Sequence, residues 1–215
     1  ASPDVLLGPA PGEDACVLRV EAGVLVAATD PITLTGESVG AHAVLVNAND
    51  VAVTGVRPRW FMASVLMPPG TTVGTLRKLF HAMHATLETL DVRLVGGHTE
   101  VTPAVTQPVV VGQMLGHDPQ GRYVTTSGLG VGDRIFQIGP VPIEGALVLA
   151  EHPLPADAHI DEATLAAARS ALEDPGILVV EPALAAHTAG ASAMHDPTEG
   201  GLANGLWEMA AASGV

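Results

Sequence analysis

Acidic side chains and glycines stand together before a helix-like stretch near the C-terminus. The segment His195-Asp196-Pro197-Thr198-Glu199-Gly200 leads through Gly201 into an apolar run of helical spacing. We expect Thr198 to cap this helix and Gly200 and Gly201 to let a ligand approach the backbone. The expected buried stripe of the helix consists of Leu202, Leu206, Met209 and Ala210. Carboxylates beside free amide groups suit a metal-bridged phosphate, whereas a plain capped helix after a Gly/Pro turn is the alternative.

Four more polar motifs lie upstream, each at an end of an apolar run. They are Gly12-Glu13-Asp14-Ala15, Ala28-Thr29-Asp30-Pro31, Asn47-Ala48-Asn49-Asp50-Val51-Ala52 and Gly96-Gly97-His98-Thr99-Glu100. Mg²⁺ prefers oxygen ligands, usually a few carboxylates together with substrate phosphates and water. Dispersed acids fit that preference better than a calcium loop or a lysine-based phosphate loop, and the sequence contains neither pattern. For each acid taken alone, a cap, a turn or a solvated position is the alternative.

The first two motifs flank two predicted strands. Residues 15–20 and 24–29 have strand-like composition, with Asp14 just before the first strand and Asp30 just after the second. If these strands are neighbours, both carboxylates lie at one edge of the sheet. The pattern therefore predicts a pair of acids at that edge.

The third motif belongs to a predicted helix over residues 39–54, closed by Gly55. On a helix, Asn47 and Asp50 project from one face and Asn49 lies on its flank. Asp50 stands in a very apolar helix, so it needs a partner that compensates its charge.

Two further predictions concern strands. Residues 93–95 are expected to form a strand that stops at Gly96-Gly97, where backbone N–H groups can face a ligand. Residues 60–67 and 108–115 form apolar strands that are too long and hydrophobic to remain as open edges. These strands therefore need a cover, either a partner chain or a second domain.

Composition limits the class of protein. The chain has 215 residues, 47% of them hydrophobic, so two domains with a sizeable core are expected. Its formal net charge of −14 argues against nucleic-acid binding. The single cysteine, Cys16, is expected to be a buried small side chain, and together with the absence of a leader or spanning segment it predicts a cytoplasmic protein without membrane contact. His81 and His84 are expected on a solvated helix flank rather than at zinc.

Six ordered motifs give the chain a family resemblance. It resembles the aminoimidazole ribonucleotide (AIR) synthase superfamily, whose fold has been named PurM-like. The DPTEGG segment is most similar to the DPTRGG-type segment of its hydrogenase-maturation members. The motifs are GEDA at Gly12, ATD at Ala28, NANDVA at Asn47, GGHTE at Gly96, GVGDRIFQIGPVPIEGALVLA from Gly130 to Ala150, and HDPTEGGL at His195.

This resemblance implies a fold and an activity. The fold is α/β (α+β), with an N-terminal ATP-binding and dimerisation domain over residues 1–117 and an apparently truncated C-terminal α/β domain over 118–215. The activity is the Mg²⁺- and ATP-dependent phosphorylation of an oxygen, often of an amide or carbamoyl group. A homodimer is expected, in which the N-terminal domains form a shared β-barrel and ATP and Mg²⁺ bind across the interface. The acceptor would be a small molecule or a protein terminus.

The resemblance also implies roles for individual residues. The expected metal ligands are Asp14, Asp30, Asp50 and Glu100. The expected cofactor-binding residues are Thr29, Asn47, Asn49, Gly96, Gly97 and Thr99. The expected catalytic residues are Asp196, His98 and Glu199, with His98 standing where the family usually has an acid.

Several activities share this nucleotide site and differ in the acceptor. An enzyme similar to the hydrogenase-maturation members is favoured, and thiamine-monophosphate kinase-like and AIR synthase-like activities are the alternatives. A nucleotide-binding, dimerising protein without turnover is the alternative from another class. The sequence begins close to its first motif and ends at Val215 without a C-terminal acceptor cysteine, so a partial chain or another substrate is expected.

Overall fold

The first half of the chain forms a mixed six-stranded sheet. The computed structural model describes residues 3–8, 12–33, 38–153, 158–198 and 200–215. Its strands are β1 (Val5–Leu7), β2 (Cys16–Arg19), β3 (Val24–Ile32), β4 (Pro58–Met67), β5 (Arg93–Val101) and β6 (Val109–Asp118). They lie in the order β1-β2-β3-β6-β4-β5, and within this sheet only β4 and β5 are parallel.

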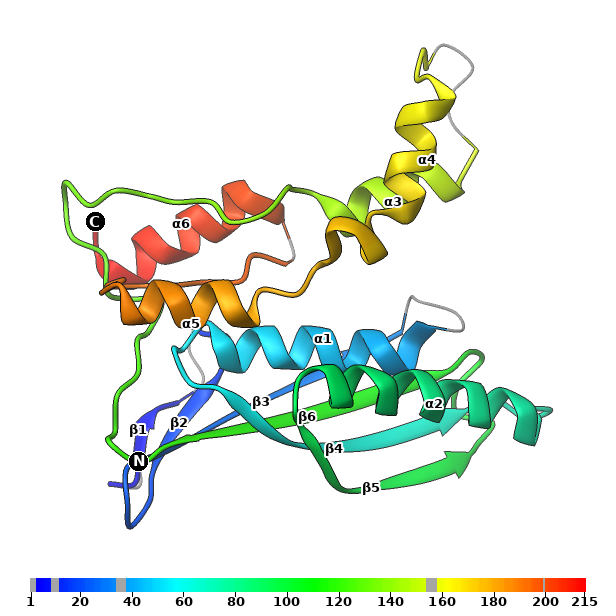
Figure 1. The fold of residues 1–215 in the computed structure, drawn as a ribbon, viewed down its shortest axis with the longest axis horizontal. Coiled ribbons are helices and arrows are strands. Elements are labelled where there is room, and N and C mark those ends of the chain that lie inside the picture. Colours follow the sequence, from blue (N-terminus) through cyan, green and yellow to red (C-terminus); the bar gives the residue numbers. More distant parts are fainter. Residues whose placement is uncertain (1–2, 9–11, 34–37, 154–157, 199) are drawn as a thin grey trace.

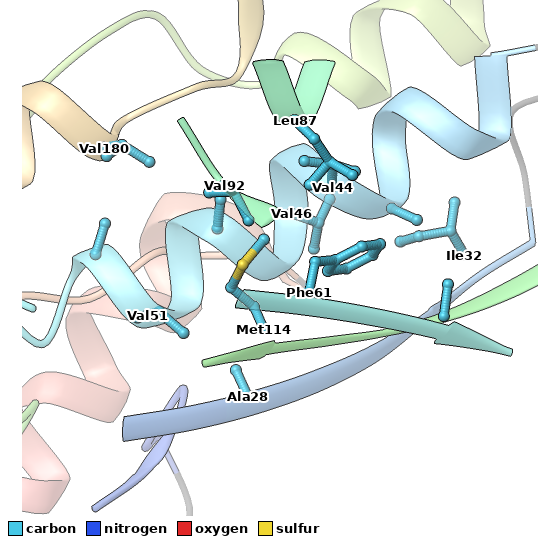
Figure 2. Packing of buried hydrophobic residues seen from close by; sticks show 14 of the residues in the cluster. Ala28, Ile32, Val44, Val46, Val51, Phe61, Leu87, Val92, Met114 and Val180 are labelled. Atoms are coloured by element: carbon cyan, nitrogen blue, oxygen red, sulfur yellow. The ribbon is translucent and has the colours of Figure 1, made fainter. Parts of the chain in front are cut away.

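Helices α1 (Val39–Ala52) and α2 (Val73–Thr89) cover one face of this sheet (Figure 1). Alternate residues of the strands point toward the helices, as in Val24, Val26 and Ala28 of β3. Figure 2 shows Phe61 and Met114 from the sheet beneath Val44 and Val46 of α1. Twelve of the 14 residues of α1 are buried, because further helices cover the side that faces away from the sheet. Helix α1 is therefore the central element of the molecule.

The prediction that a strand stops at Gly96-Gly97 is wrong. Strand β5 continues through both glycines to Val101 and pairs in parallel with β4 over this whole stretch. Gly97 has φ of +150°, and a Cβ atom there would lie 2.2 Å from the carbonyl oxygen of Ala63. The glycine thus permits close strand pairing at this point instead of ending the strand.

The premise that residues 60–67 and 108–115 would be open edges is also wrong. Strands β4 and β6 pair with each other inside the sheet, and β1 and β5 are its edges. Strand β3 is longer than predicted, so that Asp30 lies within it, opposite Gly112 of β6. Local apolar patterns revealed the strands but not their order, which depends on contacts between distant segments.

The second half, after Asp118, is mainly helical in its described residues. It contains α3 (Ile143–Glu151), α4 (Glu162–Ser170), the short π-helical turn η2 (Leu172–Gly176), α5 (Val180–Thr188) and α6 (Gly201–Ser213). Helix α5 runs beside α1, α6 lies beyond it, and α3 and α4 project away from the sheet (Figure 1). The isolated bridge between Thr125 and Ala193 is the β-pairing that the structure describes here. None of the described helices combines the length and apolarity that a membrane crossing requires.

The start of α6 differs from the prediction. Thr198 is not its cap: Gly200, with φ of +80°, is the N-cap residue, and the Thr198 carbonyl accepts a hydrogen bond from the Gly201 N–H at 3.1 Å. Gly205 is the buried residue of α6, and Pro197 packs so closely against it that an added Cβ atom would lie 2.5 Å from Cβ of Pro197. The predicted stripe is only half-buried; it comprises Leu202, Leu206, Met209 and Ala210.

Candidate functional site

Three acids from distant motifs meet where the two halves of the chain join. Asp14 precedes β2, Asp50 lies in the last turn of α1, and Asp196 lies ahead of α6. The backbone N–H of Asp196 donates to Oδ2 of Asp14 at 3.5 Å. Both Asp14 and Asp196 raise the pKa of Asp50 through their charges, as does Asp30. The structure thus assembles an acidic cluster from four of the predicted motif residues.

Asp50 is the most strongly perturbed member of this cluster. Its side chain lies in the buried α1, and the residue is 8% exposed. Burial raises the pKa of Asp50 to about 9, and the neighbouring carboxylates add to the effect. A carboxyl group in this position carries its charge readily only when a cation accompanies it.

The pKa of Asp196 is also raised, but less than that of Asp50. Burial raises the pKa of its carboxyl group to about 6, and the charge of Asp14 contributes in the same direction. A hydrogen bond from Asn49 and the charge of His195 oppose this shift. Acids at functional sites often have shifted pKa values, so Asp196 is a candidate functional acid, and its catalytic role stays a prediction.

His195 and Glu208 complete the cluster, and sequence reasoning missed both. Nδ1 of His195 lies 2.8 Å from Oδ2 of Asp14, and Nε2 lies 2.9 Å from Oε2 of Glu208 in α6. Burial lowers the pKa of His195, but the two carboxylates outweigh it and raise the value to about 9. The position of His195 next to Asp196 was a signal in the sequence, whereas Glu208 looks like an ordinary helix residue.

The two asparagines of α1 bond in different directions. Oδ1 of Asn47 accepts a hydrogen bond from the backbone N–H of Asp30 at 2.9 Å, and its Nδ2 donates to the Ala43 carbonyl at 2.8 Å. Asn49 instead reaches the second half, where its side chain bonds to the backbone of Ile177 and Val179. Both residues are almost fully buried. They hold the elements on either side of Asp50 in place.

The remaining predicted residues form a second group on β5. Residues Gly96, Gly97, His98 and Thr99 line a cavity of about 200 Å³ between β5 and α2, together with Ala63, Phe80 and Leu94. Nε2 of His98 lies 3.8 Å from Oε2 of Glu100, and both side chains are more than half exposed. The backbone of Gly96 and Gly97 is thus accessible, as predicted for a nucleotide-binding segment, but it lies on an edge strand.

These two groups do not meet within one chain. Asp30 is opposite Gly112, Gly112 is opposite Ala63, and Ala63 is opposite Gly97 along one row of the sheet. Three inter-strand spacings separate the ends of this row, which is about 14 Å. Glu100 lies further along β5 and does not join the acidic cluster of the same chain.

Thr29 and Glu199 were also predicted to be site residues. Thr29 donates from Oγ1 to the Gly112 carbonyl at 2.8 Å, on the row next to Asp30. Glu199, the weaker catalytic candidate, lies outside the described residues. Its predicted role therefore stays a prediction.

The acidic cluster fits Mg²⁺ by its chemistry. Its carboxylates offer the oxygen ligands that Mg²⁺ prefers, and burial together with the neighbouring acids raises the pKa of Asp50, so a cation there would stabilise its charged form. Among the described residues, no three His, Cys, Asp or Glu side chains are arranged around one point where a metal could sit. Substrate phosphates and water would have to supply further ligands, which is usual for Mg²⁺.

The fold and the site together define an α/β protein whose two halves join at a buried acidic cluster. Residues 12–117 match the profile of the AIR synthase related protein, N-terminal domain, and residues 130–215 match that of its C-terminal domain. The chain belongs to the AIR synthase-related family, and within it the chain is close to HypE.

Individual relatives agree with this placement. The carbamoyl dehydratase HypE of Rhodobacter capsulatus is 32% identical over 189 residues, covering 86% of this chain and 52% of the relative. The chain thus spans about half the length of the curated relatives it matches. Thiamine-monophosphate kinase from Stenotrophomonas maltophilia K279a superimposes with a TM-score of 0.74 at 25% identity, over 99% of this chain and 68% of that structure. HypE from E. coli, a hydrogenase maturation protein, gives 0.68 at 24% identity, over 90% and 59%.

Proposed function

We propose that this chain is part of a HypE-like, Mg²⁺-dependent enzyme that uses ATP to phosphorylate an oxygen of an amide or carbamoyl group. The observation that carries the proposal is the convergence of Asp14, Asp50 and Asp196 on one buried cluster. The Rhodobacter capsulatus relative is named a carbamoyl dehydratase. Phosphorylation turns a poor leaving oxygen into a good one, which is the step that dehydration of a carbamoyl group requires.

In this proposal, residues 1–117 form the ATP-binding domain and residues 118–215 belong to the domain that presents the acceptor. Asp14 and Asp50 hold Mg²⁺, with Asp30 close by, and Asp196 comes from the second half to the transferred group. Bound Mg²⁺ would neutralise the triphosphate and the charge that develops on the transferred phosphoryl group. Helix α1 keeps Asp50 fixed, because the sheet and α5 enclose that helix.

The β5 segment contacts the nucleotide in a homodimer. Within one chain, Gly97 and Asp30 are about 14 Å apart, so a second copy would bring its own β5 segment toward this cluster. Helices α1 and α2 leave the other face of the sheet uncovered (Figure 1). Met62, Leu66 and Leu115, which alternate along their strands with the buried residues, are half-buried apolar side chains of that face. Pairing of two such faces would bury these side chains and supports a dimer through the N-terminal half.

A thiamine-monophosphate kinase-like activity is the second candidate. The superposition with the kinase structure from Stenotrophomonas maltophilia covers nearly the whole chain, and this shared fold supports a kinase-like activity. Both candidates use the acidic cluster and differ in the group that receives the phosphate.

The test is nucleotide turnover by the full-length protein with Mg²⁺ and a panel of acceptors. The panel contains a peptide ending in a carbamoylated cysteine, thiamine monophosphate and the AIR synthase substrate. We expect ADP release that depends on the carbamoylated peptide and is lost in Asp50→Asn. Turnover with thiamine monophosphate alone would establish the second candidate, and absence of Mg²⁺-dependent turnover with every acceptor would leave a nucleotide-binding protein.

A further inference from the structure

Asn49 neighbours Asp50 on α1, but its side chain bonds to the second half of the chain. Its Nδ2 donates to the Ile177 carbonyl at 2.7 Å, and its Oδ1 accepts from the Val179 N–H at 2.9 Å. Asn49 also lies close enough to Asp196 to lower the pKa of its carboxyl group, against the larger effect of burial. One side chain of α1 thus contacts both the start of α5 and the acid that precedes α6.

The chemistry of the two bonds to Ile177 and Val179 requires an amide. Nδ2 carries the N–H donor that the Ile177 carbonyl accepts, and Oδ1 accepts from the Val179 N–H. Aspartate would keep the acceptor, lose both donors and add another charge to the acidic cluster. Alanine would leave the Val179 N–H and the Ile177 carbonyl without these partners at a position that is 2% exposed.

These bonds also leave Asn49 little capacity to contact a nucleotide. A ligand that bonded to its amide would have to replace the contacts to Ile177, Val179 or Asp196. Val179 is the N-cap residue of α5, and its own side chain provides no cap. Asn49 thereby fixes where α5 begins, beside the turn of α1 that carries Asp50.

We propose that Asn49 is a positioning residue that keeps Asp196 beside Asp50 by tying residues 177–179 of the second half to α1, next to the Asp196 carboxyl group. The inference rests on the proposed function only in its claim that Asp196 acts with the metal ion. The tether itself is a separate claim, carried by the bonds to Ile177 and Val179.

The experiment is a double-mutant cycle on Mn²⁺ affinity, with Mn²⁺ as the probe for the metal site. Asn49→Ala, Asp196→Ala and the double variant of the full-length protein are titrated by calorimetry. We expect each single change to weaken Mn²⁺ binding about tenfold, and the double variant to bind no more weakly than Asp196→Ala. Effects that multiply in the double variant, or an unchanged affinity in Asn49→Ala when Asp196→Ala is weakened, would overturn the inference.

Hydrogen exchange at the Val179 amide separates this inference from the proposed function. We expect at least tenfold faster exchange in Asn49→Ala and unchanged exchange in Asp196→Ala. If Asp196→Ala binds Mn²⁺ normally, the metal role of Asp196 is wrong, and slow Val179 exchange in Asn49→Ala would then overturn the tether as well.

Thr54→Val is the matched control, because the Thr54 hydroxyl bonds only within its own helix end, to the Val51 carbonyl at 2.7 Å. This variant loses a buried hydrogen bond just after the C-terminal end of α1 without touching residues 177–179. It should alter stability while leaving Mn²⁺ affinity and Val179 exchange unchanged. Should Asn49→Ala fail to fold, Asn49→Ser provides the same comparison with a smaller polar side chain.

Discussion

The imidazole of His195 and the carboxylate of Asp14 form a 2.8 Å hydrogen bond between positions 181 residues apart. Asp14 belongs to the region that matches the N-terminal profile, and His195 to the region that matches the C-terminal profile. Both side chains are largely buried, at 6% and 14% exposure. The pair therefore connects the two halves of the chain at the acidic cluster, with Glu208 supporting the imidazole from α6.

Replacing His195 distinguishes its two contacts. Asn places its N–H group near the position of Nδ1, whereas Gln reaches the position of Nε2. We expect His195→Ala to lower the free energy of unfolding by about 1–3 kcal/mol, and His195→Asn to restore more of it than His195→Gln. Urea denaturation of the three variants measures this. Greater restoration by Gln than by Asn would mean that the contact with Glu208, inside the second half, is the important one.

Asp50→Asn tests the metal site. Removing one charge leaves the Mg-triphosphate less well neutralised, so binding of Mg-ATP should weaken by roughly 1–3 kcal/mol. Folding should survive, because burial and neighbouring acids already disfavour the charged form of Asp50. Calorimetric titration measures the affinity and thermal denaturation checks the fold. An unchanged affinity would count against a role for Asp50 at the metal.

Asp196→Ala tests the acid that the second half contributes. A carboxylate that acts on the transferred phosphoryl group affects turnover far more than ATP affinity. A purely structural role would lower the melting temperature and leave the turnover rate normal. Gly200, not Asp196, is the N-cap residue of α6, so capping of that helix is no longer the structural alternative. Steady-state kinetics of the full-length variant separate these outcomes.

Leu115→Asp tests the proposed dimer. Leu115 lies on β6, in the middle of the sheet, and faces away from α1 and α2. A charge there would be costly in a paired apolar face, so the variant should sediment as a monomer where the unchanged protein is a dimer at micromolar concentration. The control is Ala85→Asp, which adds the same charge at an exposed position of α2, on the opposite side of the sheet. A monomeric unchanged protein would rule out this dimer.

The bond between His42 and Glu144 predicts a pH effect. Nε2 of His42 lies 2.5 Å from Oε1 of Glu144, and this bond lowers the pKa of the carboxyl group against the opposing effect of burial. A lowered pKa in the folded state means that the contribution to stability is present above the ordinary value of 4.5 and is lost as the pH falls through the folded-state value.

Glu144→Gln should therefore be less stable than the unchanged protein at pH 7 and should match it in acid. The difference should be small, since the Glu144 side chain is 53% exposed. Urea denaturation from pH 7 down to pH 3 measures it. A difference that stays constant over this range would show that the charge of Glu144 is not involved.

Much of the local structure could be predicted from residue patterns. Alternating and helical spacings placed β2, β3, β4, β6 and α1 to within a few residues, because these patterns reflect contacts inside one element. The motifs also placed Asp14 and Asp30 at β2 and β3, and Asp50 on a buried helix in need of a partner. His81 and His84 lie on an exposed flank of α2, as predicted.

Only the tertiary structure decided which of these elements are neighbours and which side chains meet. The pairing of β5 with β4 carries that strand through Gly96 and Gly97, and the pairing of β4 with β6 places both inside the sheet. The contacts of Asn49 with Ile177 and of His195 with Asp14 join residues more than a hundred positions apart. A local pattern contains no information on such pairs, because their energy comes from burial and hydrogen bonds that exist only once the two halves of the chain have come together.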